Sequence, residues 1–178
     1  MKYKILFISA VLFSVPAFSL EKLPVIHIYA YSQAITQGKD PGKGIINENG
    51  SEEKENAKPG IHYLIYVEQA GLPAIKPQQI WISGICYSIK SIAITNTPIG
   101  LEDQAVYGES KKTILVAETS NKVIQLIING ISPVPIKSSP SLKKLIASSD
   151  LVVSYLWKGK KYYRGIKKIK LLEPIASV

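Results

Sequence analysis

Short runs of β-branched and aromatic residues, separated by polar breaks that contain glycine, recur along most of this chain. Residues 79–94 read QIWISGICYSIKSIAI, with Ser83-Gly84 between the two apolar runs. A two-residue hairpin turn needs residues that accept a positive φ, and an x-Gly pair between such runs is typical of that turn. The pattern therefore predicts a β-hairpin that turns at Ser83-Gly84.

Two later stretches have the same arrangement. Residues 122–137 read KVIQLIINGISPVPIK and residues 154–170 read SYLWKGKKYYRGIKKIK. Their glycine pairs are Asn129-Gly130 and Lys158-Gly159, and Asn-Gly is the strongest turn pattern of the three. We predict a hairpin at each, although the matched residues are too unevenly spaced to establish a sequence repeat.

Other strands follow from the same reading. They are predicted at residues 25–31, 61–68, 113–118 and 150–157. The second of these, IHYLIYVE, is apolar on both alternations, which indicates a strand covered on both faces. One short helix is predicted within residues 138–149, because Ser139 can cap its start and Pro140 suits its first turn.

Strands at intervals of about ten residues, with no repeated helices between them, indicate an all-β and mainly antiparallel fold. The sequence leaves two architectures open. One is an immunoglobulin-like β-sandwich and the other is a partly open barrel, each with at most one or two short helices.

Residues 1–19 resemble a signal peptide. Lys2 and Lys4 precede a short apolar run, Pro16 follows it, and Ala17 and Ser19 supply the small residues that a signal peptidase requires. The apolar run is shorter than the roughly 20 residues that span a bilayer. The prediction is an exported protein, periplasmic or secreted, with no transmembrane segment after cleavage.

Residues 20–178 are expected to form a single β-rich domain. Within it, residues 36–60 read TQGKDPGKGIINENGSEEKENAKPG, with very little apolar surface to offset the entropy lost on ordering. We predict that these residues form a long, flexible polar loop, that it separates the first strand from the main sheet, and that folding does not require it.

Positive charge is concentrated at the end of the chain. The formal net charge is +9, and residues 158–178 hold seven cations against Glu173 alone. With neighbouring tyrosines, these cations form the predicted partner-binding set, on a late strand that could lie at a sheet edge. Its members are Lys158, Lys160, Lys161, Tyr162, Tyr163, Arg164, Lys167, Lys168 and Lys170. An envelope protein or an anionic surface polymer would fit such a surface, but lysines also protect exposed strand edges. Nucleic acid is not expected, because export and the lack of a single-strand-binding motif argue against it.

Residues suited to catalysis are few and scattered. His27 and His62 are the only histidines and Cys86 is the only cysteine, so no intramolecular disulfide can form and no spaced metal-ligand cluster is present. Cys86 shares the more polar strand face with Ser88 and Lys90. This position leaves open a disulfide between two chains or a role as a nucleophile. We predict no cofactor.

The expected function is a non-enzymatic binding or structural module of the cell envelope or extracellular space. It would interact through a sheet face or through the basic C-terminal edge. The alternative is a secreted hydrolase whose catalytic residues converge only in three dimensions.

Overall fold

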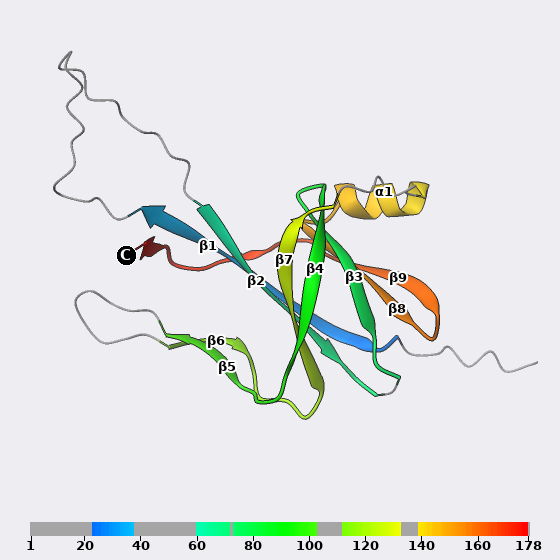
Figure 1. Ribbon diagram of the computed structural model, residues 1–178, viewed down its shortest axis with the longest axis horizontal. Helices are drawn as coiled ribbons and strands as arrows, with labels where there is room; N and C mark the ends of the chain where they lie inside the picture. The colour runs from blue at the N-terminus through cyan, green and yellow to red at the C-terminus, as the bar shows by residue number, and fades with distance from the viewer. Residues whose placement is uncertain (1–22, 38–59, 72, 103–111, 133–138, 178) are drawn as a thin grey trace, which may run out of the picture.

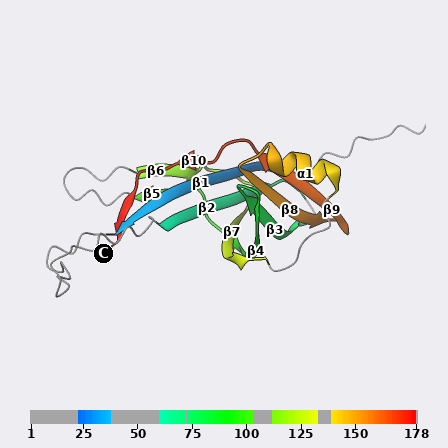
Figure 2. The same ribbon diagram turned by 90° about the horizontal axis from the view of Figure 1, so that it is seen from above.

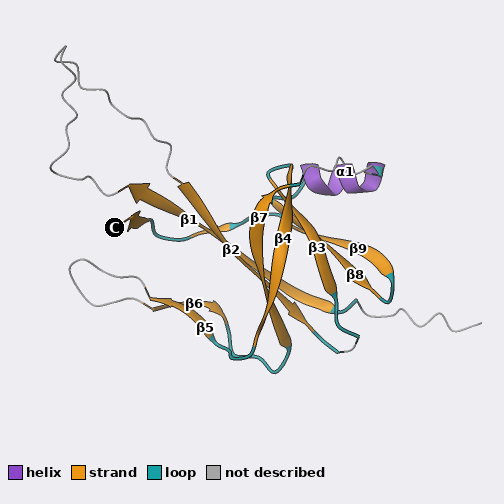
Figure 3. Cartoon of the chain, in the orientation of Figure 1, coloured by secondary structure: helices purple, strands orange, loops and turns teal. Residues whose placement is uncertain are grey.

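A computed structural model of the chain describes residues 23–37, 60–71, 73–102, 112–132 and 139–177. Strands dominate this part of the chain, beside one short helix (Figure 3). The elements are β1 (Val25–Gln37), β2 (Gly60–Gln69), β3 (Lys76–Ile82), β4 (Ile85–Ile94), β5 (Ile99–Glu102), β6 (Lys112–Val116), β7 (Lys122–Ile131), α1 (Pro140–Ala147), β8 (Leu151–Trp157), β9 (Lys160–Ile166), β10 (Lys170–Leu171) and β11 (Ile175–Ser177).

Nine strands make one sheet in the order β10-β1-β2-β7-β4-β3-β8-β9, and β11 also pairs with β1. All neighbours from β1 to β9 are antiparallel, whereas β10 and β11 run parallel to β1. The sheet curls into a half-barrel (Figures 1 and 2). The all-β, mainly antiparallel prediction is therefore confirmed, and the curl corresponds to its partly open barrel form. The immunoglobulin-like assignment stays a prediction.

Alternating residues fill the inner face of this half-barrel. In β2, Ile65 and Val67 point inward and are almost completely buried, and Val153 and Tyr155 do the same in β8. They belong to one cluster that also takes side chains from β1, β3 and β7. Because successive side chains of a strand point to opposite faces, the residues between them must be covered from outside.

Two separate layers cover the outer face. The β5–β6 hairpin, a two-stranded sheet of its own, contributes Leu115 and Val116 to a cluster with Tyr31, Leu64 and Tyr66. Helix α1 covers another area through Leu142, which packs on Trp81 and Val152. Residues 64–69 of β2 are buried on both faces, as predicted, but Ile61 and His62 are exposed, so the prediction of a covered strand is wrong for the start of the range 61–68.

The first and third predicted hairpins are confirmed. Ser83 and Gly84 have φ values of 48° and 85°, and Lys158 and Gly159 have values of 48° and 73°. Two consecutive residues with positive φ are the geometry of the tight hairpin turn whose twist matches that of its strands. These turns join β3 to β4 and β8 to β9.

The second predicted hairpin is wrong. Asn129 and Gly130 lie inside β7, which continues to Ile131 along β4. Ser88 pairs with Gly130 and Ile89 with Ile128, so Asn129 is an extra residue in the ladder. Gly130 has a φ of 131°, which glycine tolerates at a β-bulge as it does at a turn. The sequence correctly indicated a residue with a positive φ at this place. Pairing with β4 makes that residue part of a bulge and not of a turn.

The first strand is longer than predicted and is not separated from the main sheet. β1 runs to Gln37 and pairs with the whole of β2, from Val25 opposite Gln69 to Ile35 opposite Gly60. Thr36, Gln37 and Gly60, which the sequence assigned to the polar loop, are strand residues. The rest of that loop lies outside the described residues, as does the predicted signal peptide.

The predicted strand at residues 113–118 corresponds to β6, which begins one residue earlier and ends two residues earlier, and which belongs to the small sheet. The predicted helix is confirmed as α1. The Ser139 hydroxyl accepts a hydrogen bond from the Leu142 backbone N–H at 3.2 Å, and Pro140 occupies the first turn. Among the described residues, no helix has the length and apolar content needed to cross a bilayer.

Replacing residues 38–59 with a short Gly-Ser linker should leave the half-barrel intact. Residues 35 and 60 are cross-strand partners, so a few residues suffice to join β1 to β2. The cost of closing a loop changes by only about 0.6 kcal/mol for each halving of its length. Thermal unfolding should therefore shift by no more than a few degrees, and a large loss of stability would show that the segment packs on the domain.

Candidate functional site

The predicted partner-binding residues do not form one surface. β9 is the last strand of the sheet, which confirms the predicted edge position. Lys160 and Lys161 are exposed on it, and Lys158 in the preceding turn holds its Nζ 4.6 Å from the centre of the Trp157 ring. Lys167 and Lys168 are exposed beyond the end of β9.

The other members of the set lie on different faces. Tyr162 points inward and stacks on Tyr155, with ring centroids 5.8 Å apart. Tyr163 points outward to Trp81, at 6.1 Å. The alternation of the strand therefore separates these two neighbours, which were predicted to act together.

Arg164 and Lys170 connect β9 and β10 to β1. Arg164 donates a hydrogen bond from Nη1 to the Val25 carbonyl oxygen at 2.6 Å, which ties the last strand of the sheet to the start of β1. Lys170 begins β10, beside Tyr31, and its Nζ lies 5.9 Å from the centre of that ring. Both side chains have structural contacts within the domain.

A cleft with a volume of about 470 Å³ opens between β2 and β7. The cleft forms because β2 and β7 pair along only part of their lengths. β2 and β7 pair from Gln69 opposite Lys122 to Ile65 opposite Leu126, where the pairing stops. Both strands continue, β2 back to Gly60 and β7 on to Ile131. The residues that line the cleft are Ile61, His62, Tyr63, Tyr87, Gln125, Leu126, Ile127 and Ile128.

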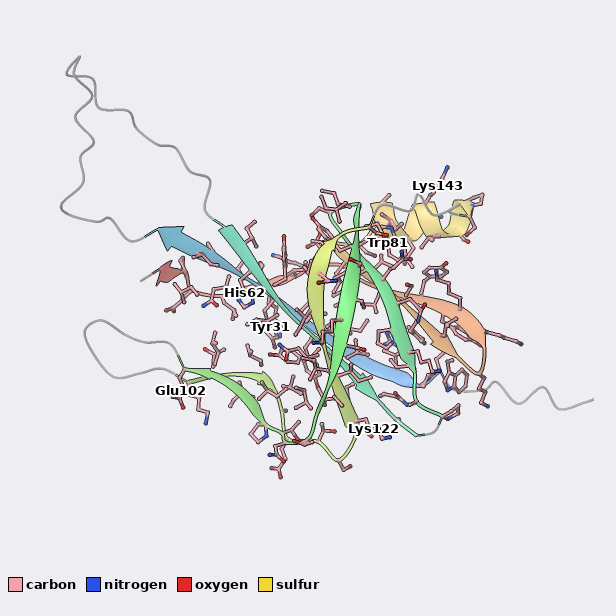
Figure 4. All side chains as sticks on the ribbon, viewed as in Figure 1. Tyr31, His62, Trp81, Glu102, Lys122 and Lys143 are labelled. Atoms are coloured by element: carbon pink, nitrogen blue, oxygen red, sulfur yellow. The ribbon has the colours of Figure 1, made fainter. Side chains whose placement is uncertain are left out.

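The cleft has an apolar and a more polar side. Tyr63, Tyr87 and Ile128 adjoin the inner cluster of the half-barrel. By strand alternation, His62 and Gln125 face the other way. Figure 4 labels His62 on this part of β2. Ile61 is 59% exposed and Ile127 is 39% exposed, so apolar surface is accessible on both walls of the cleft.

The sequence points to only two of these residues: His62, as a possible metal ligand or catalytic base, and Tyr87, as one of the aromatic residues near a hairpin turn that could belong to a binding face. The two runs GIHYL and IINGI carry no charged residue, which is a weak indication of a surface meant for contact. Where the pairing of β2 with β7 ends is not visible in either run.

Glu68 lies at the centre of a polar network on the outer face. Its carboxylate accepts hydrogen bonds from Tyr29 Oη at 2.9 Å, Thr119 Oγ1 at 2.8 Å and Asn121 Nδ2 at 2.8 Å. Burial alone would raise the pKa of Glu68, but the hydrogen bonds from Asn121, Thr119 and Tyr29 outweigh it and hold the pKa below its ordinary value. Burial and the bond to Glu68 also raise the pKa of Tyr29 to about 12. The network fastens the chain before β7 to β1 and β2.

The remaining candidates for chemistry are apart from the cleft. Cys86 packs beside Trp81 in the cluster under α1, and burial raises the pKa of its thiol. A nucleophilic thiol needs the opposite shift. His27 lies against Tyr29, with ring centroids 4.4 Å apart. Among the described residues, no three histidine, cysteine or acidic side chains gather as metal ligands would.

A second hollow of about 590 Å³ lies between α1 and the β3–β4 turn. Its ionisable residues are Lys143 and Asp150. The Asp150 carboxylate accepts a hydrogen bond from the Ile169 backbone N–H at 3.1 Å, which gives this aspartate, directly before β8, a structural role.

The cleft is thus the feature of the described chain best suited to holding another molecule. Comparison with known protein families, with curated proteins and with solved structures found no match to this chain.

Proposed function

We propose that this chain is an exported, non-enzymatic binding module of the cell envelope or extracellular space, and that it holds a partner protein in the cleft between β2 and β7. The observation that carries the proposal is the cleft itself. Sites for small molecules are typically hollows of about 300–1,000 Å³, lined mainly by apolar and aromatic side chains with a few polar groups, and a side chain or short segment of a partner protein can be held in the same way. The cleft has about 470 Å³, four isoleucine or leucine residues and two tyrosines. Export rests on the leader-like residues 1–19.

The basic residues have a secondary role in this proposal. Lys160 and Lys161 stand on the exposed β9 strand, where charge opposes unwanted pairing with other chains. Contact with an anionic polymer remains the competing role for them, because exposed lysines attract such a surface at low ionic strength.

The test is capture of the partner from the envelope fraction of the native cell by three forms of the chain. They are the unaltered chain, Ile127→Asp in the cleft, and the combined replacement of Lys160, Lys161, Lys167 and Lys168 by Gln. We expect the first and third forms to recover one stoichiometric partner. Ile127→Asp should recover at least 10-fold less, because a carboxylate buried without a counter-charge is strongly disfavoured.

Ile114→Asp is the matched control, since Ile114 is an isoleucine exposed to 48% on β6, outside the cleft. It should capture the partner as well as the unaltered chain does. Loss of capture only in the lysine variant would assign binding to the basic end instead. Recovery of no partner, together with hydrolysis of a model substrate by the purified chain, would favour the hydrolase alternative.

A further inference from the structure

Resting on this proposed function, we propose that the cleft binds by strand addition: an extended segment of the partner protein pairs with the open edge of β2 between Ile61 and Leu64. The argument starts from the backbone. Each strand has two hydrogen-bonding edges, and an exposed edge presents a row of N–H and C=O groups ready to pair with another chain.

Both walls of the cleft have one edge occupied and one open. From Gly60 to Leu64, β2 pairs with β1 on one side. From Ile127 to Ile131, β7 pairs with β4 on one side. Among the described residues, no strand pairs with the facing edges of these two segments. The cleft is therefore a gap inside a sheet, with backbone hydrogen-bonding groups on both sides of it.

These two edges are unprotected, in contrast to β9. The β9 strand carries Lys160 and Lys161, the usual protection against edge-to-edge pairing. Residues 60–64 and 127–131 have no lysine, proline or acidic side chain. Instead, Ile61, Ile127 and Ile131 expose from 39% to 70% of their surface. Within the described residues, one edge is protected by charge and two apolar edges are open, and this contrast indicates that the open edges receive a partner.

β2 is the better template of the two. Its pairing with β1 is regular from Gly60 to Leu64, whereas β7 has the bulge at Asn129. A bulge bends a strand and disturbs the spacing of its edge groups. β2 and β7 are antiparallel, so an inserted segment can continue the antiparallel pattern along only one of them. We assign that pairing to β2, with β7 supplying side-chain contacts.

The lining defines the chemistry of the segment. Side chains pointing to the inner face would meet Tyr63, Tyr87 and Ile128, and those pointing outward would meet His62 and Gln125. Because a strand alternates its faces, the segment should have apolar residues at every second position and uncharged polar residues between them. A charged residue on the inner side would be buried without a partner.

The experiment selects peptides of eight random residues for binding to the full chain, and then modifies the selected peptides at the backbone. We expect alternating apolar and uncharged polar residues. Methylation of every second backbone nitrogen removes the donors on one edge of a strand. One methylated series should bind at least 10-fold more weakly than the parent peptide, and the complementary series should bind much as the parent does. Within Ile61 to Leu64, amide exchange should slow on binding at the residues whose N–H groups face away from β1, because the other N–H groups are on the edge that already pairs with β1.

The matched protein variant is Ile61→Lys. This substitution adds a charge at the open edge of β2, and the position is already exposed. It should lose peptide binding, while Ile114→Lys on β6 should retain it. Selection of no peptide above the Ile61→Lys background would overturn the inference. So would dimerisation of the chain with slowed exchange at the same amides, because a second copy would then occupy the edge.

The two proposals fail separately. If partner capture depends on Ile127 but neither methylated series weakens peptide binding, the cleft binds through side chains alone. Strand addition is then wrong and the binding module stands. If no partner is captured and no peptide binds, both proposals are wrong.

Discussion

Trp81→Ala is expected to lower the free energy of unfolding by about 3–5 kcal/mol, which is the range for removing a large buried aromatic side chain. Trp81 is only 5% exposed, and it lies between the sheet and α1, with Leu142 and Val152 as buried neighbours. Its ring also faces Tyr163 of β9 at 6.1 Å. One side chain of β3 therefore contacts β8, β9 and the helix, and Figure 4 labels it beside α1.

Urea unfolding followed by circular dichroism gives the measurement. Lys143→Ala is the control, since Lys143 is on the same helix with its side chain exposed, and it should change stability by less than about 0.5 kcal/mol. A loss below 1 kcal/mol for Trp81→Ala would mean that α1 contributes little to holding the sheet. Peptide binding in the β2–β7 cleft should persist at urea concentrations where the variant is still folded.

Glu68→Gln should lower the free energy of unfolding by about 2–3 kcal/mol at neutral pH. Hydrogen bonds to a charged group contribute about 1.5–3 kcal/mol, and a buried donor left without an acceptor carries a further penalty. The carboxylate accepts three hydrogen bonds, whereas an amide in the same place has one acceptor oxygen and brings two donors of its own. The amide oxygen can still accept from Thr119 and Asn121, but the Tyr29 hydroxyl loses the acceptor to which it donates.

The pH dependence follows from the lowered pKa of Glu68. A carboxyl group whose pKa is lower in the folded state stabilises the fold above its ordinary pKa of 4.5, and this contribution disappears as the pH falls through the folded-state pKa. The difference between the unaltered chain and Glu68→Gln should therefore be largest near pH 7 and shrink steadily below pH 4.5. Unfolding free energies measured from pH 7 to pH 3 test this.

Glu118→Gln provides the comparison, because Glu118 is an exposed carboxylate in the same connection to β7. It should have little effect at any pH. A destabilisation by Glu68→Gln that stays constant down to pH 3 would contradict the ionised network and indicate that only the shape of the side chain matters.

Local chemistry was sufficient where a few neighbouring residues settle the conformation. Ser83-Gly84 and Lys158-Gly159 form turns because a two-residue hairpin loop requires positive φ values, and these residues adopt them. Helix α1 begins at Pro140 because the Ser139 hydroxyl lies next to it in sequence. The all-β class followed in the same way, from alternation within each strand. All these features depend on interactions over four residues or fewer.

The basic end shows where local reading stops being sufficient. Its place on an edge strand was predicted, but which way each side chain points depends on the curl of the sheet. Tyr162 faces the inner cluster because β8 and β9 close over it, and Arg164 reaches β1 because the half-barrel brings Val25 near. A run of charges along the sequence is thus divided between two faces of a strand.

Asn129-Gly130 and the cleft were decided by tertiary structure alone. The Asn-Gly pair satisfies both a turn and a bulge, and the pairing of β7 with β4 selects the bulge. The cleft exists because β2 and β7, about 60 residues apart in sequence, stop pairing at Ile65 and Leu126 while each continues beside another strand. The sequence by itself determined that these segments are strands, since that depends on local alternation. Only the tertiary structure decided which edges stay open, because an edge is open or paired according to residues distant in the chain.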